Sequence, residues 1–233
     1  ILPVPDDVST LEERLGYLFR NRELLLSALT HPSFAYESHD KKADNQRLEF
    51  LGDAVLQLIV SETLYTLKSE AAEGEMTRMR ANLVCEPTLT RIAHTLDLGA
   101  FLRLGHGEQM TGGRDNPSNL SDALEAVFGA IYLDGGLGAV DAVISKLFSP
   151  YVELALRGQL HYDHKSLLYE WAQSDKGRDV EFKLLDMTGP EHDRQFTVGL
   201  FVEGKLINNG TGKTKKAAEQ DASRRFFEDV RKD

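Results

Sequence analysis

The apolar residues of this chain change their spacing about two thirds of the way along it, and this change limits the fold more than any other feature. From Leu11 to about Arg157 they recur mostly at helical intervals of three and four residues. After a short segment at 158–162 they alternate with polar residues in two runs, as in half-buried β-strands. The pattern predicts two domains, an all-α domain at 1–157 and a small α+β domain at 163–233, joined by a linker.

The C-terminal domain is predicted to have the element order α-β-β-β-α. We expect, in order, a helix over 165–173, strands over 180–184, 196–202 and 205–208, a turn at 208–210 and a helix from about 214. The last helix is amphipathic, because Ala218, Ala222 and Phe226 are spaced four apart.

The composition is that of an ordinary globular protein with an uneven distribution of charge. Of the 233 residues, 41% are hydrophobic and 27% are charged. The formal net charge of −10 argues against a protein that binds nucleic acid by bulk charge. Residues 163–233 contain 13 Lys and Arg against 14 Asp and Glu, so their net charge is only −1. The acidity therefore lies in the first two thirds of the chain. A local basic patch is still possible within residues 163–233.

The cysteine count and the apolar runs indicate a reducing compartment. Cys85 is the only cysteine, which excludes a disulfide framework within the chain. The stretch from Ile1 to Pro5 is too short and too rich in proline for a signal peptide. No stretch approaches the roughly 18 apolar residues of a membrane span. We therefore expect a cytoplasmic protein without a membrane partner.

Two acidic residues stand four apart in the most informative helical segment. Glu49 and Asp53 share one helix face, where they repel each other unless something positive lies between them. Gly52 lies in the middle of the same predicted helix, where glycine costs about 1 kcal/mol relative to alanine. Its presence indicates close approach of another backbone or of a ligand.

A second acidic pair, Asp122 and Glu125, stands three apart among small and apolar residues. Asn119 or Ser121 would be a reasonable N-cap for its helix. Carboxylates in such surroundings are costly to bury unless they are paired or bound to metal. If the two helices face each other, four carboxylates converge, and such hard oxygen ligands suit Mg²⁺ or Mn²⁺.

Spacing alone leaves other interpretations of these acids open. Each pair could be an ordinary solvated helix face, because acidic residues are mostly exposed, and Asp122 could simply favour the helix dipole. A di-iron carboxylate bundle would need Glu-x-x-His pairs on facing helices, and neither pair has a histidine at that offset.

Longer motifs resemble one family. The segment from Asn45 to Leu56 reads NQRLEFLGDAVL and resembles the signature of the ribonuclease III family, from which only Gln46 departs. Four further blocks resemble the family's other motifs in the family's order: HPSF at 31–34, EGEMTRMR at 73–80, LRLG at 102–105 and SDALEA at 121–126. The resemblance covers essentially the whole chain.

The resemblance implies an all-helical nuclease domain that works as a homodimer and uses Mg²⁺, for which Mn²⁺ can substitute. The family's four metal-site acids fall on Glu49, Asp53, Asp122 and Glu125. Of these, Asp53 and Glu125 match the two that are usually called catalytic. A bound Mg²⁺ can lower the pKa of a water, act as a Lewis acid and orient the reacting groups of a phosphodiester.

Three further positions receive roles from the same resemblance. Glu73 falls on another acid associated with the cleavage site. Gln46 replaces the family's usual Glu near the RNA backbone, so we expect changed RNA contacts or rate rather than an inactive enzyme. Phe50 matches an aromatic residue that inserts into the partner subunit, although an aromatic beside an apolar stripe is more often ordinary core.

The C-terminal segment GTGKTKKAAEQ, which starts at Gly210, resembles the corresponding block of a double-stranded RNA-binding domain. Without that resemblance, a lysine cluster at a helix start is more often a solvated face. The resemblance assigns RNA contacts to five residues: Glu170, His192, Lys213, Lys215 and Lys216. Tyr169 departs from the family, which often has Gln there. Domains of this kind recognise the shape of A-form RNA over about 16 base pairs.

These observations predict a metal-dependent endoribonuclease that cuts double-stranded RNA and needs no small-molecule cofactor. The family implies 5′-phosphate and 3′-hydroxyl ends with two-nucleotide 3′ overhangs, and processing of ribosomal RNA precursors, messenger RNA and other structured transcripts. Two alternatives remain: a non-catalytic RNA-binding protein on the same fold, and a phosphohydrolase of small nucleotides. Retention of all four acids disfavours the first, and the RNA-binding domain disfavours the second.

Overall fold

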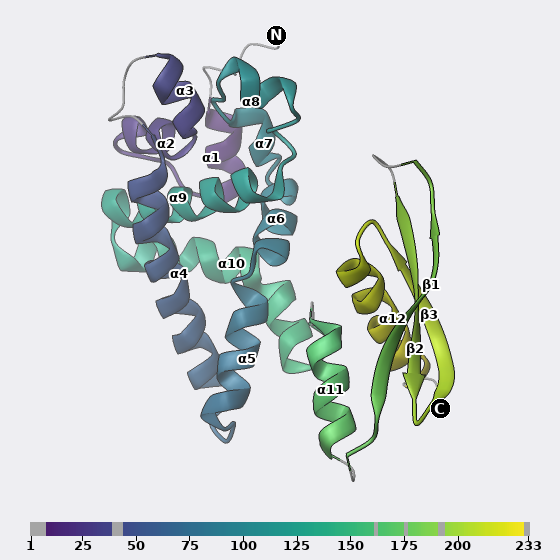
Figure 1. Ribbon diagram of the computed structural model, residues 1–233. Helices are drawn as coiled ribbons and strands as arrows, with labels where there is room; N and C mark the ends of the chain where they lie inside the picture. The colour runs from purple at the N-terminus through teal and green to yellow at the C-terminus, as the bar shows by residue number, and fades with distance from the viewer. Residues whose placement is uncertain (1–7, 39–43, 161–162, 175–176, 191–193, 231–233) are drawn as a thin grey trace. The chain divides into compact units, whose positions relative to one another are not determined.

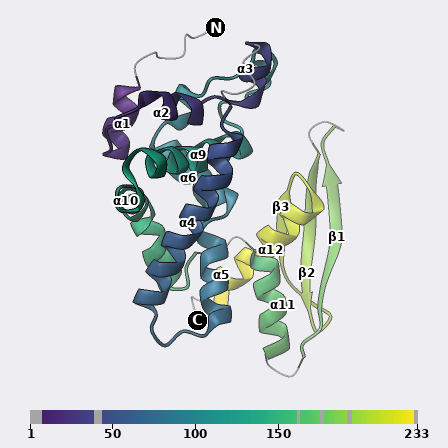
Figure 2. The same ribbon diagram turned by 90° about the vertical axis from the view of Figure 1, so that its left-hand side faces the viewer.

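The chain divides into two compact units, residues 1–160 and 161–233, which are described separately (Figures 1 and 2). The computed structural model describes residues 8–38, 44–160, 163–174, 177–190 and 194–230.

The first unit is all-helical, as the spacing of apolar residues predicts. Its described helices are α1 (Ser9–Leu15), α2 (Arg22–Ala28), α3 (Pro32–Glu37), α4 (Gln46–Leu67), α5 (Glu73–Leu83), α6 (Glu86–Thr95), α7 (Leu98–Phe101), α8 (His106–Met110), α9 (Pro117–Gly135) and α10 (Leu137–Leu156). Within the described residues of this unit, extended pairing is limited to one bridge between Thr30 and Arg103.

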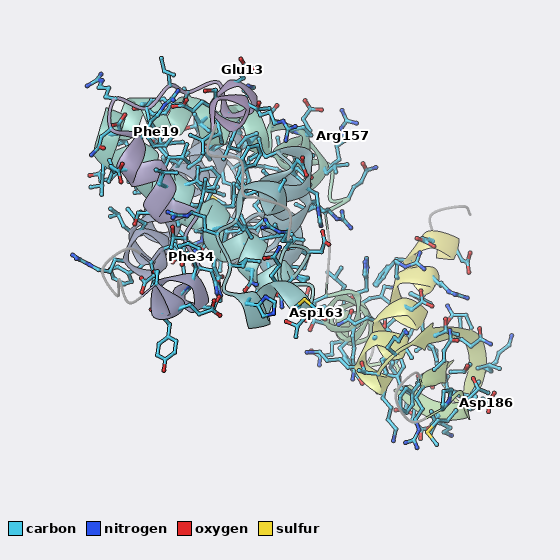
Figure 3. The ribbon with its side chains drawn as sticks, turned by 90° about the horizontal axis from the view of Figure 1, so that it is seen from above. Glu13, Phe19, Phe34, Arg157, Asp163 and Asp186 are labelled. Atoms are coloured by element: carbon cyan, nitrogen blue, oxygen red, sulfur yellow. The ribbon has the colours of Figure 1, made fainter. Side chains whose placement is uncertain are left out.

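Helix α9 is the centre of this unit and packs against α2, α4, α6 and α10. Between Asn119 and Ile131 every residue is buried except Asp122 and Glu125, which are half-buried. An α-helix that is apolar nearly all round belongs in a core. Between Asn119 and Ile131 the two carboxylates are therefore the charged residues and the exceptions to full burial. By contrast, Glu13 lies exposed on the surface of the unit (Figure 3).

The start of α9 differs from the sequence expectation. The Asn116 side chain accepts a hydrogen bond from the Ser118 N–H at 2.9 Å and caps the helix, with Pro117 in its first turn. Proline suits this position because its fixed φ is already helical and it has no N–H to leave unpaired. The helix therefore begins earlier than expected, and Asn119 and Ser121 lie inside it rather than at its cap.

Helix α4 comes closer to a membrane-spanning helix than the sequence analysis expected. It is the one helix in the described part of the chain that is long and apolar enough to cross a membrane by length and composition. Its buried residues include Leu56, Ile59 and Leu64, and it packs along α9 and α5. A core helix meets the same criterion, and the packing of this unit accounts for the buried part of the apolar surface of α4.

The second unit has the predicted α-β-β-β-α order. Its elements are α11 (His164–Ser174), β1 (Val180–Thr188), β2 (Gln195–Val202), β3 (Lys205–Gly212) and α12 (Lys215–Val230). The strands form an antiparallel sheet in the order β1-β2-β3. The core between helices and sheet is centred on five residues: Leu168, Leu200, Val202, Ala222 and Phe226.

The turn expected at residues 208–210 is wrong. These residues lie within β3, where Asn208 pairs with Leu200 and Gly210 pairs with Val198. The chain leaves the strand later than expected, at residues 213 and 214, just before α12 begins. Gly210 is needed in the strand because a Cβ there would overlap the backbone of Ala218 and Ala222 on α12. A residue that is typical of turns thus serves close strand–helix packing.

Candidate active site

Helices α4 and α9 touch through their backbones, and this contact positions the acidic residues (Figure 2). A Cβ on Gly52 would overlap the carbonyl group of Glu125, and a Cβ on Gly129 would overlap the carbonyl oxygen of Leu48. Only glycine has no side chain to prevent such an approach. The sequence expectation that Gly52 marks a close backbone approach is confirmed, and the neighbour is α9.

The crossing brings the two acidic pairs within electrostatic reach of each other. Glu49 and Asp53 lie on α4, next to Gly52, while Glu125 contributes its own backbone to the crossing. All four acids, including Asp122, are half-buried. The negative charges of Asp53, Asp122 and Glu49 all act on Glu125. The interpretation of each pair as an independent solvated helix face is therefore excluded.

Glu125 is the most strongly perturbed of the four. Burial, and then the charges of Asp53, Asp122 and Glu49, raises the pKa of its carboxyl to about 8. Desolvation disfavours the charged form of an acid, and nearby like charges add to that effect. Glu125 is therefore largely protonated at neutral pH as long as no cation offsets these charges.

Glu49 and Asp122 are perturbed in the same direction. Burial, together with the charges of Asp122 and Asp53, raises the pKa of the Glu49 carboxyl. Burial also raises the pKa of Asp122, against the opposing effect of hydrogen bonds from Ser121 and Ser118 and of the charge on His31. In the part of the chain that the structure describes, no lysine or arginine forms an ion pair with any of the four acids.

Gln57 makes a contact to the site that the sequence analysis missed. Its Nε2 donates hydrogen bonds to Asp53 Oδ1 and Oδ2, both at 2.9 Å. The signal was available in the spacing, because residue 57 follows Asp53 by one helical turn on the same face.

The donor set fits a hard divalent cation in its chemistry: it has four carboxylates that are partly desolvated and that, within the described residues, form no ion pair with a lysine or arginine. Their present placement is not that of a closed ligand set. Within the described residues, no group of three or more His, Cys, Asp or Glu side chains is arranged so that it could hold a metal ion.

The remaining nuclease positions are exposed, in contrast to these four half-buried acids. Gln46 begins α4 and is exposed, with its N–H bonded to Asp44 Oδ1 at 3.2 Å. Glu73 begins α5, is exposed, and accepts a hydrogen bond from Thr77 Oγ1 at 2.9 Å. Phe50 is 81% exposed on α4. It is therefore not an ordinary core residue within this unit.

Glu73 lines a hollow of about 650 Å³ between α4 and α5. Apolar residues form much of its wall: Leu58, Leu64, Tyr65, Met76 and Leu137. Of these, Tyr65 is 74% exposed. The hollow is large enough for an aromatic side chain and is open to a partner.

The lysines of the second unit gather at the start of α12. Lys213, Lys215 and Lys216 are exposed, and Thr214 Oγ1 accepts a hydrogen bond from the Ala217 N–H at 3.1 Å. Backbone N–H groups and the helix dipole favour an anion at such a helix start. His192 lies outside the described residues.

The first helix of this unit, α11, is fixed next to the same end of α12. Lys165 Nζ lies 2.6 Å from Glu219 Oε2, and Gln220 Nε2 donates to Asp163 Oδ1 at 2.7 Å. Desolvation raises the pKa of Asp163, but hydrogen bonds from Gln220 and Ser166 and the charge of Lys216 outweigh it and hold the pKa low. Tyr169 and Glu170 are exposed on α11. Exposed groups of both helices are thus held at a fixed spacing.

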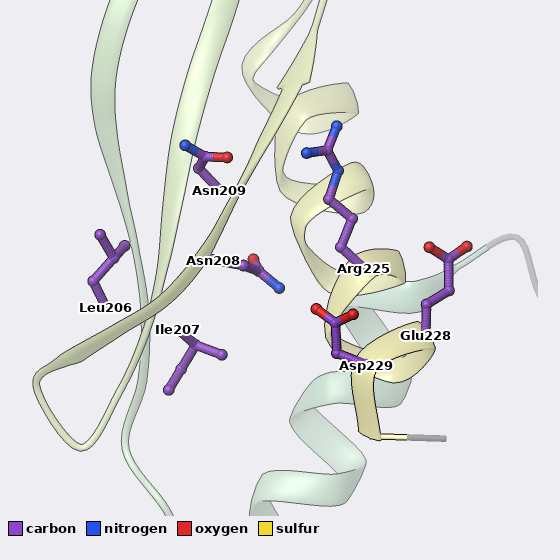
Figure 4. A pocket seen from close by; sticks show the side chains of 7 residues that line it. All are labelled: Leu206, Ile207, Asn208, Asn209, Arg225, Glu228 and Asp229. Atoms are coloured by element: carbon purple, nitrogen blue, oxygen red, sulfur yellow. The ribbon is translucent and has the colours of Figure 1, made fainter. Parts of the chain in front are cut away.

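A second hollow lies at the other end of α12, against β3, with a volume of about 380 Å³ (Figure 4). Among the described residues, the buried amide of Asn208 has no hydrogen-bond partner. Arg225 on its wall pairs with Asp221 at 2.9 Å, and Glu228 pairs with Arg224. Its lining carries two carboxylates, Glu228 and Asp229, and one guanidinium, Arg225. This hollow is therefore unsuited to phosphate and is separate from the lysine cluster.

Comparisons with known proteins agree with both units. Residues 21–151 match the family described as Ribonuclease-III-like, and residues 164–230 match the double-stranded RNA binding motif. The protein "Ribonuclease 3" of Pelotomaculum thermopropionicum is 46% identical over 221 residues, which are 94% of this chain and 92% of that protein. "Ribonuclease 3" of Caldanaerobacter subterraneus is 44% identical over 91% of this chain and 93% of its own length.

A solved structure extends the likeness to the fold. The nuclease domain of ribonuclease III from Campylobacter jejuni is 42% identical, with a TM-score of 0.59, and the match covers 62% of this chain and 97% of that domain.

A helical nuclease unit followed by a double-stranded RNA-binding unit defines an endoribonuclease of double-stranded RNA. The chain belongs to the ribonuclease III family.

The helix crossing yields a stability prediction. Gly52→Ala should lower the free energy of unfolding by about 1–3 kcal/mol, because the methyl group forces α4 away from α9. Gly74→Ala on α5 is the matched control, since no atom lies near its Cβ, and it should be neutral or stabilising by up to about 1 kcal/mol. Urea unfolding followed by far-ultraviolet circular dichroism measures both.

The fluorescence of Trp171, the only tryptophan, reports the second unit separately in the same experiment. Its transition should stay unchanged in Gly52→Ala. Equal stability of Gly52→Ala and wild type would contradict the backbone contact.

The raised pKa of Glu125 predicts a stability that depends on pH. In the metal-free protein the folded-state pKa of about 8 lies above the ordinary value, so the folded state binds more protons between those values. Stability should therefore fall as pH rises through this range. Glu125→Gln should melt at a higher temperature than wild type at pH 9 and at a similar temperature at pH 5.

The melting temperatures are measured in the presence of a chelator. Glu153→Gln is the matched control, because Glu153 is an exposed residue of α10. If Glu125→Gln and Glu153→Gln have the same pH profile, Glu125 does not have a raised pKa.

Proposed function

We propose that this chain is a Mg²⁺-dependent endoribonuclease that hydrolyses phosphodiester bonds in double-stranded RNA, and that Mn²⁺ substitutes. Its nuclease domain spans 1–157 and its RNA-binding domain 163–233, joined by 158–162. The four half-buried carboxylates at the α4–α9 crossing are the observation that supports this most strongly, because their mutual repulsion needs a cation. Membership in the ribonuclease III family supports the substrate class.

In this proposal Glu49, Asp53, Asp122 and Glu125 hold the metal, and Asp53 and Glu125 are the catalytic pair. Bound Mg²⁺ supplies an acidified water and neutralises phosphoryl charge. The helix crossing keeps these four carboxylates near one another so that they can act as metal ligands. Glu125 is mostly protonated before the cation arrives, so it must lose its proton to become a ligand. Gln46 and Glu73 support the cleavage site from the starts of α4 and α5.

The products in this proposal have 5′-phosphate and 3′-hydroxyl ends with two-nucleotide 3′ overhangs. The substrates are ribosomal RNA precursors and other structured transcripts, including messenger RNA, in the cytoplasm. Family resemblance supports these details. They do not follow from the geometry of the site.

Binding of the duplex is assigned to the second unit, through Glu170, His192, Lys213, Lys215 and Lys216. The exposure of the three lysines at a capped helix start supports this assignment, as does the fixed spacing of α11 beside them. Because the domain has almost no net charge, affinity comes from these placed lysines and should fall with salt. Tyr169 offers a phenol where the family often has an amide.

We also propose that the active enzyme is a homodimer in which Phe50 inserts into the hollow between α4 and α5 of its partner. An apolar side chain that is 81% exposed and a hollow of about 650 Å³ lined by apolar residues are complementary in chemistry. The solved Campylobacter jejuni relative is described as having a region involved in dimer formation of its nuclease domain.

Cleavage of a long perfect RNA duplex in Mg²⁺ tests the enzymatic proposal. Wild type and Glu153→Gln should release short duplexes. Glu125→Gln should be slower by about 100-fold or more, since even residues that only support metal ligands typically cost 10–100-fold. A gel shift in Ca²⁺ should show equal duplex binding by all three proteins. If wild type binds the duplex without cutting it, the chain is a non-catalytic RNA-binding protein. If it hydrolyses only small nucleotides, the chain is a phosphohydrolase.

Sedimentation tests the dimer. Phe50→Glu should convert the protein to a monomer at micromolar concentration, because a charge placed in an apolar hollow is strongly unfavourable. Leu18→Glu is the matched control, since Leu18 is 71% exposed outside the hollow, and it should leave the dimer intact. A Phe50→Glu dimer as stable as wild type would show that Phe50 is not in the interface.

A further inference from the structure

Gln57 is the neutral residue among the charges of the nuclease site. It lies on α4 one turn after Asp53 and is half-buried. Its amide nitrogen is 2.9 Å from each oxygen of the Asp53 carboxylate. In the part of the chain that the structure describes, no other side chain donates a hydrogen bond to Asp53.

This contact matters because Asp53 is surrounded by like charge. Its charge acts on both Glu125 and Glu49, so the repulsion is mutual. A carboxylate in that position would otherwise turn toward solvent. The amide of Gln57 holds it by hydrogen bonding and adds no charge to the cluster. A glutamate at residue 57 would instead place a fifth negative charge one turn away.

The contact also leaves Asp53 able to bind a cation. Each carboxylate oxygen has two acceptor positions, and Gln57 uses one on each. Groups that hold a metal ligand in place from outside typically contribute 10–100-fold to metal affinity or activity, because they restrict the ligand before the ion arrives.

We propose that Gln57 is a positioning residue for Asp53: its amide restricts the Asp53 carboxylate and so strengthens divalent-cation binding at the α4–α9 crossing. The inference rests on the proposed function, since it assumes that Asp53 is a metal ligand. Gln57 touches neither the RNA nor the metal in this account. It acts only through Asp53.

Titration of the RNA-free full chain with Mn²⁺, followed by electron paramagnetic resonance, is the direct test. Gln57→Leu keeps the size of the side chain and removes the donor, and it should raise the Mn²⁺ dissociation constant about tenfold or more. Gln109→Leu on α8, also half-buried, is the matched control and should bind Mn²⁺ like wild type. A thermal melt and a gel shift on duplex RNA in Ca²⁺ should be unchanged in both variants, which establishes that they are folded.

Steady-state cleavage adds a second readout. For Gln57→Leu at fixed Mg²⁺, kcat should fall while KM for the duplex stays the same, and additional Mg²⁺ should recover part of the loss. A Mn²⁺ dissociation constant within twofold of wild type, or a lower one, would overturn the inference. If wild type itself binds no stoichiometric Mn²⁺, the proposed metal site fails, and that result is distinct from equal binding by wild type and Gln57→Leu.

Discussion

The repulsion among four carboxylates, held together by a helix crossing that only glycine permits, is the constraint on which the nuclease unit depends. Gly52 and Gly129 let α4 and α9 meet backbone to backbone. Between Asn119 and Ile131 the other residues of α9 are buried and mostly apolar, so the crossing is anchored in the core and cannot relax by moving the helices apart. The electrostatic cost is local to the acids, while the stabilisation comes from the packing around them.

The concentration of carboxylates in the first unit also accounts for the different roles proposed for the two units. The first unit contributes most of the chain's net charge of −10, which would repel an RNA backbone. The second unit is nearly neutral and presents its lysines at one helix start. Gly210 and Gly212 allow β3 to approach α12 closely, so the position of that helix start is set by the sheet. Under the proposed function, binding and cleavage would therefore depend on different kinds of residues.

Much of the fold was predictable from the sequence, because it depends on the periodicity of apolar residues or on a single residue that is unusual at its position. The change from helical to alternating spacing predicts the helical unit and the α-β-β-β-α unit. Gly52 in mid-helix predicts the crossing. The sequence analysis did not predict the strand through Asn208 and Gly210, because a glycine that typifies turns there serves packing against α12. Pro117 likewise starts α9 before the expected caps.

Residue spacing does not predict the features of the site that depend on the direction of side chains. Gln57 was missed because the i,i+4 spacing places it beside Asp53 but does not show that its amide points at that carboxylate. The hollow between α4 and α5 requires the placement of Tyr65 and Met76 on different helices. The raised pKa of Glu125 depends on burial and on three charges from two helices, and no one-dimensional pattern specifies their separation.

Calorimetric titration with Mn²⁺ at pH 7, in buffers of different ionisation enthalpy, tests most directly whether these repelling carboxylates form a cation site. A cation that binds there must displace the proton from Glu125, whose pKa of about 8 leaves it mostly protonated at pH 7. The account predicts release of nearly one proton per Mn²⁺ bound by wild type, and almost none by Glu125→Gln. Stoichiometric binding to wild type without proton release would contradict it.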